Sequence, residues 1–114
     1  MKVITGKAKG VRLKAPPKRL TRPTTGLVKE AIFSILEGSV GHWDRVLDLY
    51  AGSGALGLEA LSRRAKWADF VDRSRKCCDV IKYNLDKAEL LDKAHVYCCG
   101  VSKALSFLSH NYDI

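Results

Sequence analysis

The sequence predicts an α/β fold of the Rossmann-like type, built on a parallel sheet. From Asp44 onward, short apolar strands alternate with helical stretches of about 10–15 residues, the rhythm of βαβ units. A glycine-rich turn follows the first of these strands, and an aspartate closes the second. With 114 residues the chain fits one compact domain and is too short for two.

The N-terminal part of the chain is predicted to form a basic β-hairpin over residues 3–15, hinged at Gly6 and Gly10. Pro16 and Pro17 end it, because proline cannot continue a hydrogen-bonded ladder. A helix capped by Thr24 or Thr25 then runs to Gly38. Its apolar residues recur on one stripe, which comprises Leu27, Val28, Ala31, Ile32, Ile35 and Leu36.

The remaining elements follow in regular order along the chain. We expect strands at 45–50, 66–72 and 95–99, and helices at 55–63, 74–85 and 101–108. Residues 112–114 open a fourth strand. The chain therefore divides into a basic β-hairpin and linker (1–24) and a partial Rossmann-like domain (25–114).

The positive charge is concentrated at one end of the chain. Residues 1–29 hold nine lysines or arginines and no acidic residue, whereas the remainder carries eleven basic and twelve acidic residues. Such a block of positive charge indicates a polyanionic partner, most simply nucleic acid. A solubilising arm is the alternative.

Several classes of protein are excluded by what the sequence lacks. No apolar run approaches the ~18–20 residues of a membrane span, and the first residues do not resemble a secretory signal, so we expect a cytoplasmic protein. The cysteines form two adjacent pairs, Cys77-Cys78 and Cys98-Cys99, with no C-x-x-C spacing. We therefore expect free thiols and no metal site.

The most specific motif is G-x-G-x-x-G at Gly52, Gly54 and Gly57, placed between a strand and a helix. Glycines at this point let the backbone turn tightly and approach a ligand closely. Asp72 lies twenty residues after Gly52, at the end of the second strand, where a carboxylate accepts hydrogen bonds from ribose hydroxyls. Together they predict an adenosine-containing cofactor.

Asp48, four residues before Gly52, favours one cofactor over another. An anion there repels a pyrophosphate but attracts the cationic end of S-adenosylmethionine. Arg73 supports the alternative, an NAD(P)-binding oxidoreductase domain, because it could meet the 2′-phosphate of NADP. A non-catalytic RNA-binding module with a vestigial glycine loop is a further alternative.

Several segments together resemble the bacterial RsmD-type methyltransferases, which transfer a methyl group from S-adenosylmethionine to the exocyclic N2 of a guanine in small-subunit ribosomal RNA. The segments that carry the resemblance are Val3–Gly6, Lys9-Gly10 with Leu13, Arg22-Pro23-Thr24, Val28–Phe33 and Val46–Ala60. The resemblance extends along the whole chain and implies the fold of class I S-adenosylmethionine-dependent methyltransferases.

The resemblance and the glycine motif together supply a set of candidate site residues. Those expected at the cofactor are Asp48, Tyr50, Ala51, Gly52, Ser53, Gly54, Asp72, Arg73 and Ser74. Those expected to meet the phosphates of ribosomal RNA are Lys7, Lys9, Arg12, Lys14 and Arg22.

The sequence departs from the family pattern in ways that bear on catalysis. The Asp/Asn-Pro-Pro-aromatic motif of the family would follow the fourth strand, and the sequence stops at Ile114 before it. We therefore expect no catalytic residue in this chain and no methyl transfer by these 114 residues alone. No acid follows the third strand, at Cys99-Gly100-Val101. A short fourth strand would also leave the first strand with an open edge, which predicts self-association.

Overall fold

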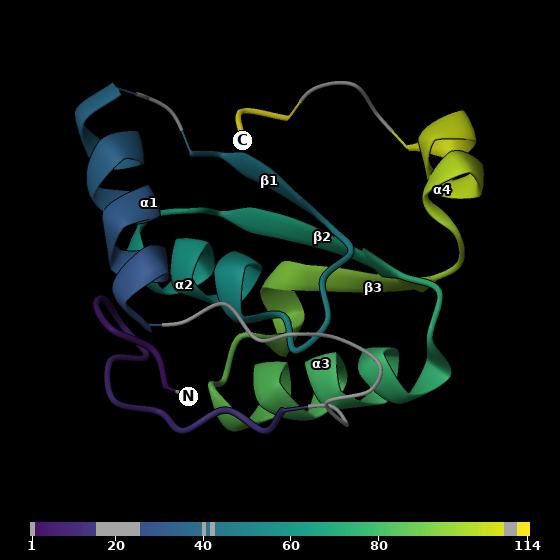
Figure 1. Cartoon of the computed structure of the whole chain (residues 1–114), viewed down its shortest axis with the longest axis horizontal. Helices are drawn as coiled ribbons and strands as arrows, with labels where there is room; N and C mark the ends of the chain where they lie inside the picture. Colours follow the sequence, from purple (N-terminus) through teal and green to yellow (C-terminus); the bar gives the residue numbers. More distant parts are fainter. Residues whose placement is uncertain (1, 16–25, 40, 42, 109–111) are drawn as a thin grey trace.

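A computed structural model describes residues 2–15, 26–39, 41, 43–108 and 112–114 (Figure 1). Its elements are α1 (Gly26–Ser39), β1 (Arg45–Leu49), α2 (Ala55–Arg63), β2 (Trp67–Asp72), α3 (Arg75–Lys87), a 3₁₀ turn (Leu91–Lys93), β3 (Ala94–Cys98) and α4 (Val101–Phe107). The predicted alternation of strands and helices is confirmed, with boundaries that differ by one or two residues. None of the described helices is long and apolar enough to cross a membrane.

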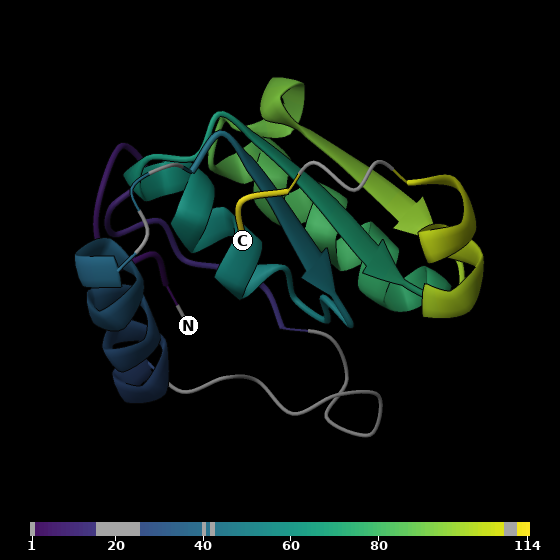
Figure 2. The ribbon, with the colours of Figure 1, turned by 90° about the horizontal axis from the view of Figure 1, so that it is seen from above.

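The three strands form a parallel sheet in the order β1-β2-β3, as the Rossmann-like prediction requires. Helices α2 and α3 cover one face and α4 lies on the other, which Figure 2 shows from above. The register aligns Asp48 with Phe70 and Asp72 with Cys98. All three strands therefore end at the same edge of the sheet, where ligands of open α/β folds bind.

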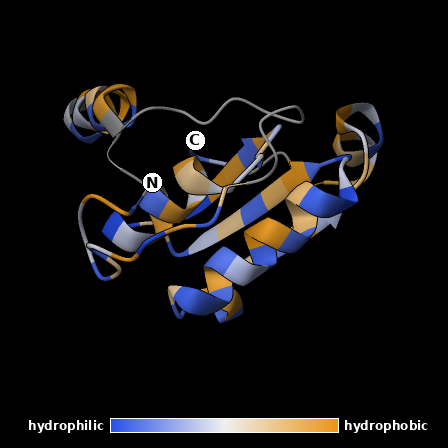
Figure 3. Cartoon of the chain, turned by 60° about the horizontal axis from the view of Figure 1, so that its bottom comes forward, coloured by the Kyte–Doolittle hydropathy of each residue, from blue (hydrophilic) through white to orange (hydrophobic). Residues whose placement is uncertain are grey.

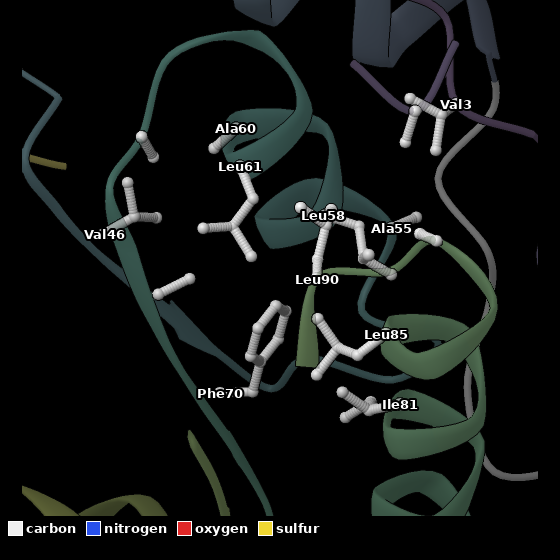
Figure 4. Close-up of a cluster of buried hydrophobic side chains, with 14 of the residues drawn as sticks. Val3, Val46, Ala55, Leu58, Ala60, Leu61, Phe70, Ile81, Leu85 and Leu90 are labelled. Carbon is white, nitrogen blue, oxygen red and sulfur yellow. The ribbon is translucent and has the colours of Figure 1, made fainter. Parts of the chain in front are cut away.

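Side-chain alternation along β2 separates two apolar clusters. Phe70 points toward Leu58 of α2 and Ile81 and Leu85 of α3, and all four are fully buried (Figure 4). Val71, one residue on, faces α4 instead. Burial on both faces explains why two apolar residues, Phe70 and Val71, stand next to each other instead of alternating with polar ones.

The N-terminal segment is a loop with one β-bridge, where the sequence predicted a hairpin. Lys2 and Arg12 form an isolated antiparallel bridge, and the Val3 N–H donates to the Val11 carbonyl at 3.0 Å. Between them the backbone turns toward α2, and the Lys7 N–H donates to the Ser62 carbonyl at 2.8 Å. Bonds to α2 thus replace the ladder. The expected linker, including the Pro16-Pro17 stop and the Thr24 or Thr25 cap, lies outside the described residues.

Helix α1 is confirmed, but the face that packs is not the predicted apolar stripe. Leu27 and Ile35 of that stripe are 81% and 67% exposed, whereas Lys29 and Phe33 are buried. Figure 3 shows α1 at the side of the molecule, with hydrophobic positions along the helix. The buried face is selected by specific contacts, because Lys29 is drawn to a buried carboxylate and the Phe33 ring lies 5.7 Å from that of Trp43.

The C-terminal residues lie along the free edge of β1. The Asp113 N–H donates to the Arg45 carbonyl at 2.8 Å, and the Leu47 N–H donates to the Ile114 carbonyl at 2.9 Å. This is the position expected for a fourth strand. Within the described chain, these two bonds reach β1 no further than Leu47.

Glu59 on α2 is a fully buried carboxylate that joins three parts of the chain. Its oxygens accept hydrogen bonds from the N–H groups of Ile4 and Thr5, at 2.9 and 3.0 Å, and from Nε of Arg63 at 2.9 Å. The buried Lys29 ammonium lies 3.2 Å away. Burial alone would raise the pKa of Glu59, but these donors and the Lys29 charge outweigh it and lower the pKa. The carboxylate is therefore ionised in the folded protein.

Replacing Glu59 tests how much this junction contributes to stability. Because Glu59→Gln leaves the Lys29 ammonium buried without its counter-charge, we expect the free energy of unfolding to fall by about 3–5 kcal/mol. Urea denaturation measures this loss. The double variant Glu59→Gln/Lys29→Met removes both charges and should recover part of it. Equal stabilities of Glu59→Gln and the unsubstituted protein would contradict the assignment.

The exposed face of α1 and the partly paired edge of β1 lead us to expect concentration-dependent self-association. Ile35→Glu places a charge on that face and should shift the protein toward monomer in sedimentation equilibrium. Leu105→Glu, at an exposed apolar position of α4, is the matched control and should have less effect. A monomer at every concentration tested would contradict this expectation.

Candidate functional site

A cavity of about 600 Å³ opens at the carboxyl ends of the strands. Tyr50 follows β1, Asp72 and Arg73 follow β2, and residues 99–102 follow β3, and these residues line the cavity. The parallel topology brings them together, because each crossover helix returns the chain so that the strands end side by side. The site is therefore a direct product of the βαβ arrangement.

Asp72 is held rigidly at this cavity by two backbone groups. Its Oδ2 accepts a hydrogen bond from the Gly52 N–H at 3.0 Å, and its Oδ1 accepts one from the Ser74 N–H at 2.9 Å. The half-buried carboxylate retains lone pairs on both oxygens. It can accept further hydrogen bonds from a diol without first losing side-chain freedom. The glycine turn and the acid twenty residues later are thus in direct contact.

The glycine turn is tight at both of its ends. Strand β1 ends at Leu49, one residue earlier than predicted, because Tyr50 adopts the left-handed conformation (φ 55°). Gly54 (φ 79°) caps α2 in the same conformation, which glycine adopts without strain. At Gly57 a Cβ atom would lie 2.4 Å from Cε2 of Phe70. The third glycine therefore allows α2 to pack against the sheet.

Asp48 lies on the other side of the turn from the cavity. It is buried, and its Oδ2 accepts a hydrogen bond from the Gly57 N–H at 3.1 Å. It lines a separate apolar pocket of about 140 Å³ between α1, β1 and α2. Burial raises the pKa of Asp48 to about 7, the Gly57 N–H counteracts this in part, and the Asp72 charge adds to it. Asp48 is therefore poised to change its charge near neutral pH.

The other predicted cofactor residues divide into those at the cavity and those behind it. Tyr50, Asp72 and Arg73 line it, and Tyr50 and Arg73 are exposed. The side chains of the two serines instead satisfy local backbone. Ser53 accepts from the Ala55 N–H at 3.3 Å, and Ser74 caps α3 by accepting from the Cys77 N–H at 3.3 Å.

The rest of the glycine turn lies behind the residues that line the cavity and is joined to them by the bond from the Gly52 N–H to Asp72. It comprises Ala51, Gly52 and Gly54, of which the two glycines are buried. Residues 99–102 also form the cavity wall; no acid stands at Cys99-Gly100-Val101, as the sequence shows, but the candidates predicted from the sequence do not include these residues. Their position after the third parallel strand places them at the edge of the sheet where ligands bind, but none of them carries a charged group that would mark them as candidate ligand contacts.

The predicted RNA-contacting lysines and arginine of the N-terminal segment are exposed. They are Lys7, Lys9, Arg12 and Lys14, while Arg22 lies outside the described residues. Lys93, in the 3₁₀ turn before β3, lies beside Lys7, and the nearness of its ammonium group lowers the pKa of Lys7. Lys93 extends the positive surface and could not be found from the sequence, because it is distant along the chain.

Comparison with known proteins assigns the whole chain to one family. Residues 1–114 match the family described as Conserved hypothetical protein 95. YlbH of Bacillus subtilis (strain 168), whose name describes an rRNA methyltransferase, is 48% identical over 105 residues, which are 92% of this chain and 56% of YlbH. Ribosomal RNA small subunit methyltransferase D of Escherichia coli (strain K12) is 39% identical over 85 residues, 75% of this chain and 42% of that protein. The chain thus spans about half the length of these relatives.

Solved structures share the fold. A hypothetical protein of Thermus thermophilus superposes with a TM-score of 0.83 at 33% identity, covering 93% of this chain and 59% of that one. The Escherichia coli protein yhhF, described as a methyltransferase, gives a TM-score of 0.79 at 32% identity, with 93% and 56% covered. The prediction of a Rossmann-like methyltransferase fold is confirmed by these similarities.

The pH dependence of stability tests the environment of Asp48. Its pKa is about 3.9 in an unfolded chain and about 7 in the folded protein, so the folded state binds more protons between these values. The contribution of Asp48 to stability is therefore present at low pH and is lost as the pH rises through 7. Each pH unit in that window changes the free energy of unfolding by up to about 1.4 kcal/mol.

Asp48→Asn keeps an acceptor for the Gly57 N–H without the charge. We expect it to stabilise the protein by roughly 1–3 kcal/mol at pH 8 and to have little effect at pH 4. Denaturation at the two pH values measures the difference, with the exposed Asp79→Asn as control. Parallel pH profiles for Asp48→Asn and the unsubstituted protein would show that burial does not perturb Asp48.

Proposed function

The chain belongs to the family described as Conserved hypothetical protein 95, which is the family of the RsmD-type methyltransferases that its sequence resembles. On this premise we propose that it forms the cofactor-binding and RNA-contacting part of an rRNA methyltransferase. The cofactor is S-adenosylmethionine, and the target is the N2 of a guanine in small-subunit ribosomal RNA. The observation that carries the proposal is the Asp72 carboxylate, fixed by the glycine turn at the edge of the cavity.

The backbone of the glycine turn favours a cofactor without phosphates. A pyrophosphate binds at such a turn through free N–H groups at the helix N-terminus. Here the Gly52 N–H donates to Asp72, the Gly54 N–H to the Ala51 carbonyl and the Gly57 N–H to Asp48. These donors are already used within the chain, and two of them by carboxylates that would repel a phosphate. S-adenosylmethionine has no phosphate, so the residues present fit it better than NAD(P).

Each residue near the cavity has a defined part in this proposal. Asp72 accepts hydrogen bonds from the ribose hydroxyls, while Tyr50 and Arg73 form the wall beside the base. Asp48 lies beneath the turn and outside the cavity, and because burial raises its pKa to about 7 it adds negative charge toward the cationic end of the cofactor only in its ionised form, above neutral pH. S-adenosylmethionine supplies an activated methyl group on a sulfonium. The exposed Lys7, Lys9, Arg12 and Lys14, together with Arg22, meet RNA phosphates.

The transfer step itself needs groups beyond those named. An exocyclic amine is a poor nucleophile, and positioned acceptors for its hydrogens must aim its lone pair at the methyl group. The Asp/Asn-Pro-Pro-aromatic motif that provides such acceptors in this family does not occur in the 114 residues. The proposal for this chain is therefore binding and positioning.

Calorimetric titration with S-adenosylhomocysteine tests the proposed site. We expect binding by the unsubstituted chain and about 10–100-fold weaker binding by Asp72→Asn, because hydrogen bonds to a charged group contribute about 1.5–3 kcal/mol. Asp79→Asn, on the exposed side of α3, should bind as the unsubstituted protein does.

Matching titrations with NADP and with RNA have two results that would each favour a different function. Tighter binding of NADP than of S-adenosylhomocysteine would indicate an oxidoreductase domain. RNA binding with a steep salt dependence but no nucleoside affinity would indicate a non-catalytic RNA-binding module.

A further inference from the structure

Asn84 on α3 is a fully buried amide whose hydrogen bonds join two distant parts of the chain. Its Oδ1 accepts from the Lys14 N–H at 2.7 Å, and its Nδ2 donates to the Lys14 carbonyl at 2.8 Å. The same Nδ2 donates to the Ser53 carbonyl at 2.9 Å. An asparagine is suited to this position, because aspartate has no donor and glutamine is longer by one methylene.

The two partners of Asn84 belong to the two proposed binding regions. Ser53 lies in the glycine turn, next to the Gly52 N–H that holds Asp72. Lys14 is the last basic residue in the described part of the N-terminal segment, and its ammonium lies 5.5 Å from the ring centroid of Tyr83, the neighbour of Asn84 on α3. One side chain thus sets the backbone position of both regions.

We infer that Asn84 is a positioning residue that couples nucleoside binding at the glycine turn to RNA binding by the N-terminal segment. This inference rests on the proposed function. A ligand that orders either region also fixes Asn84 and its other partner, so the second ligand loses less conformational entropy when it binds. The coupling is reciprocal, because each ligand must change the affinity of the other by the same factor.

Ser62 offers a matched control within the same segment. Its hydroxyl accepts from the Ala8 N–H at 2.9 Å and donates to the Thr5 carbonyl at 2.7 Å, so it also anchors the N-terminal segment. It does so from α2, with no bond to the glycine turn among the described residues. Ser62→Ala therefore loosens the segment and leaves the Asn84 connection intact.

The experiment measures the affinity of the full 114-residue chain for S-adenosylhomocysteine with and without a saturating RNA hairpin. We expect RNA to tighten nucleoside binding about 5-fold or more, at the lower end of typical allosteric coupling. Asn84→Asp keeps the acceptor for the Lys14 N–H but loses both donations. The ratio of the nucleoside affinity with RNA to the affinity without RNA should then fall to about one. Ser62→Ala should keep the ratio of the unsubstituted protein.

Hydrogen exchange on the unsubstituted chain gives a second readout that no folding defect can affect. S-adenosylhomocysteine alone should slow exchange of the Lys14 amide, and RNA alone should slow exchange in the glycine turn. If both ligands bind with a ratio of one, or if Asn84→Asp and Ser62→Ala lower the ratio equally, the inference is overturned and the proposed function stands. If S-adenosylhomocysteine does not bind the unsubstituted chain, both are overturned.

Discussion

The buried carboxylate of Glu59 is the interaction on which the arrangement of this chain depends. It satisfies two backbone donors of the N-terminal segment, the buried ammonium of Lys29 on α1 and the guanidinium of Arg63. No single partner compensates the cost of burying this charge; the four together do. Because Glu59 lies on α2, the helix that begins at the glycine turn, it holds the N-terminal elements against the helix that follows the candidate site.

The parts of the fold that the sequence predicts are those with local or regularly spaced signals. The strands and crossover helices follow from apolar runs and helical periodicity, and the contact between Asp72 and the glycine turn follows from their spacing. A βαβ unit of this length returns the chain to the carboxyl end of the neighbouring strand. Asp72 therefore comes within hydrogen-bond distance of the Gly52 N–H, twenty residues earlier in the sequence. The RsmD-type family could be recognised from the same motifs, and its match spans residues 1–114.

The parts that could not be predicted depend on contacts between distant residues. Periodicity predicted an apolar stripe on α1, but a lysine and a phenylalanine determine the buried face through Glu59 and Trp43. The burial of Asp48 behind the turn, and not at the cavity, follows from the packing of α2 at Gly57. The proximity of Lys93 to Lys7 arises only once the chain is folded. No window of sequence contains these pairs.

The way α1 is attached has a consequence for the dynamics of the molecule. The helix joins the rest through a few side chains, chiefly Lys29 and Phe33, with Glu37 bound to Arg63 near its end. Most of its surface faces solvent. Such an element opens at a lower free energy than the sheet, whose central strand β2 is buried on both faces. We therefore expect α1 to open locally more readily than the sheet, a step that would bring the buried Lys29–Glu59 pair into contact with water while the cavity at the strand ends keeps its shape.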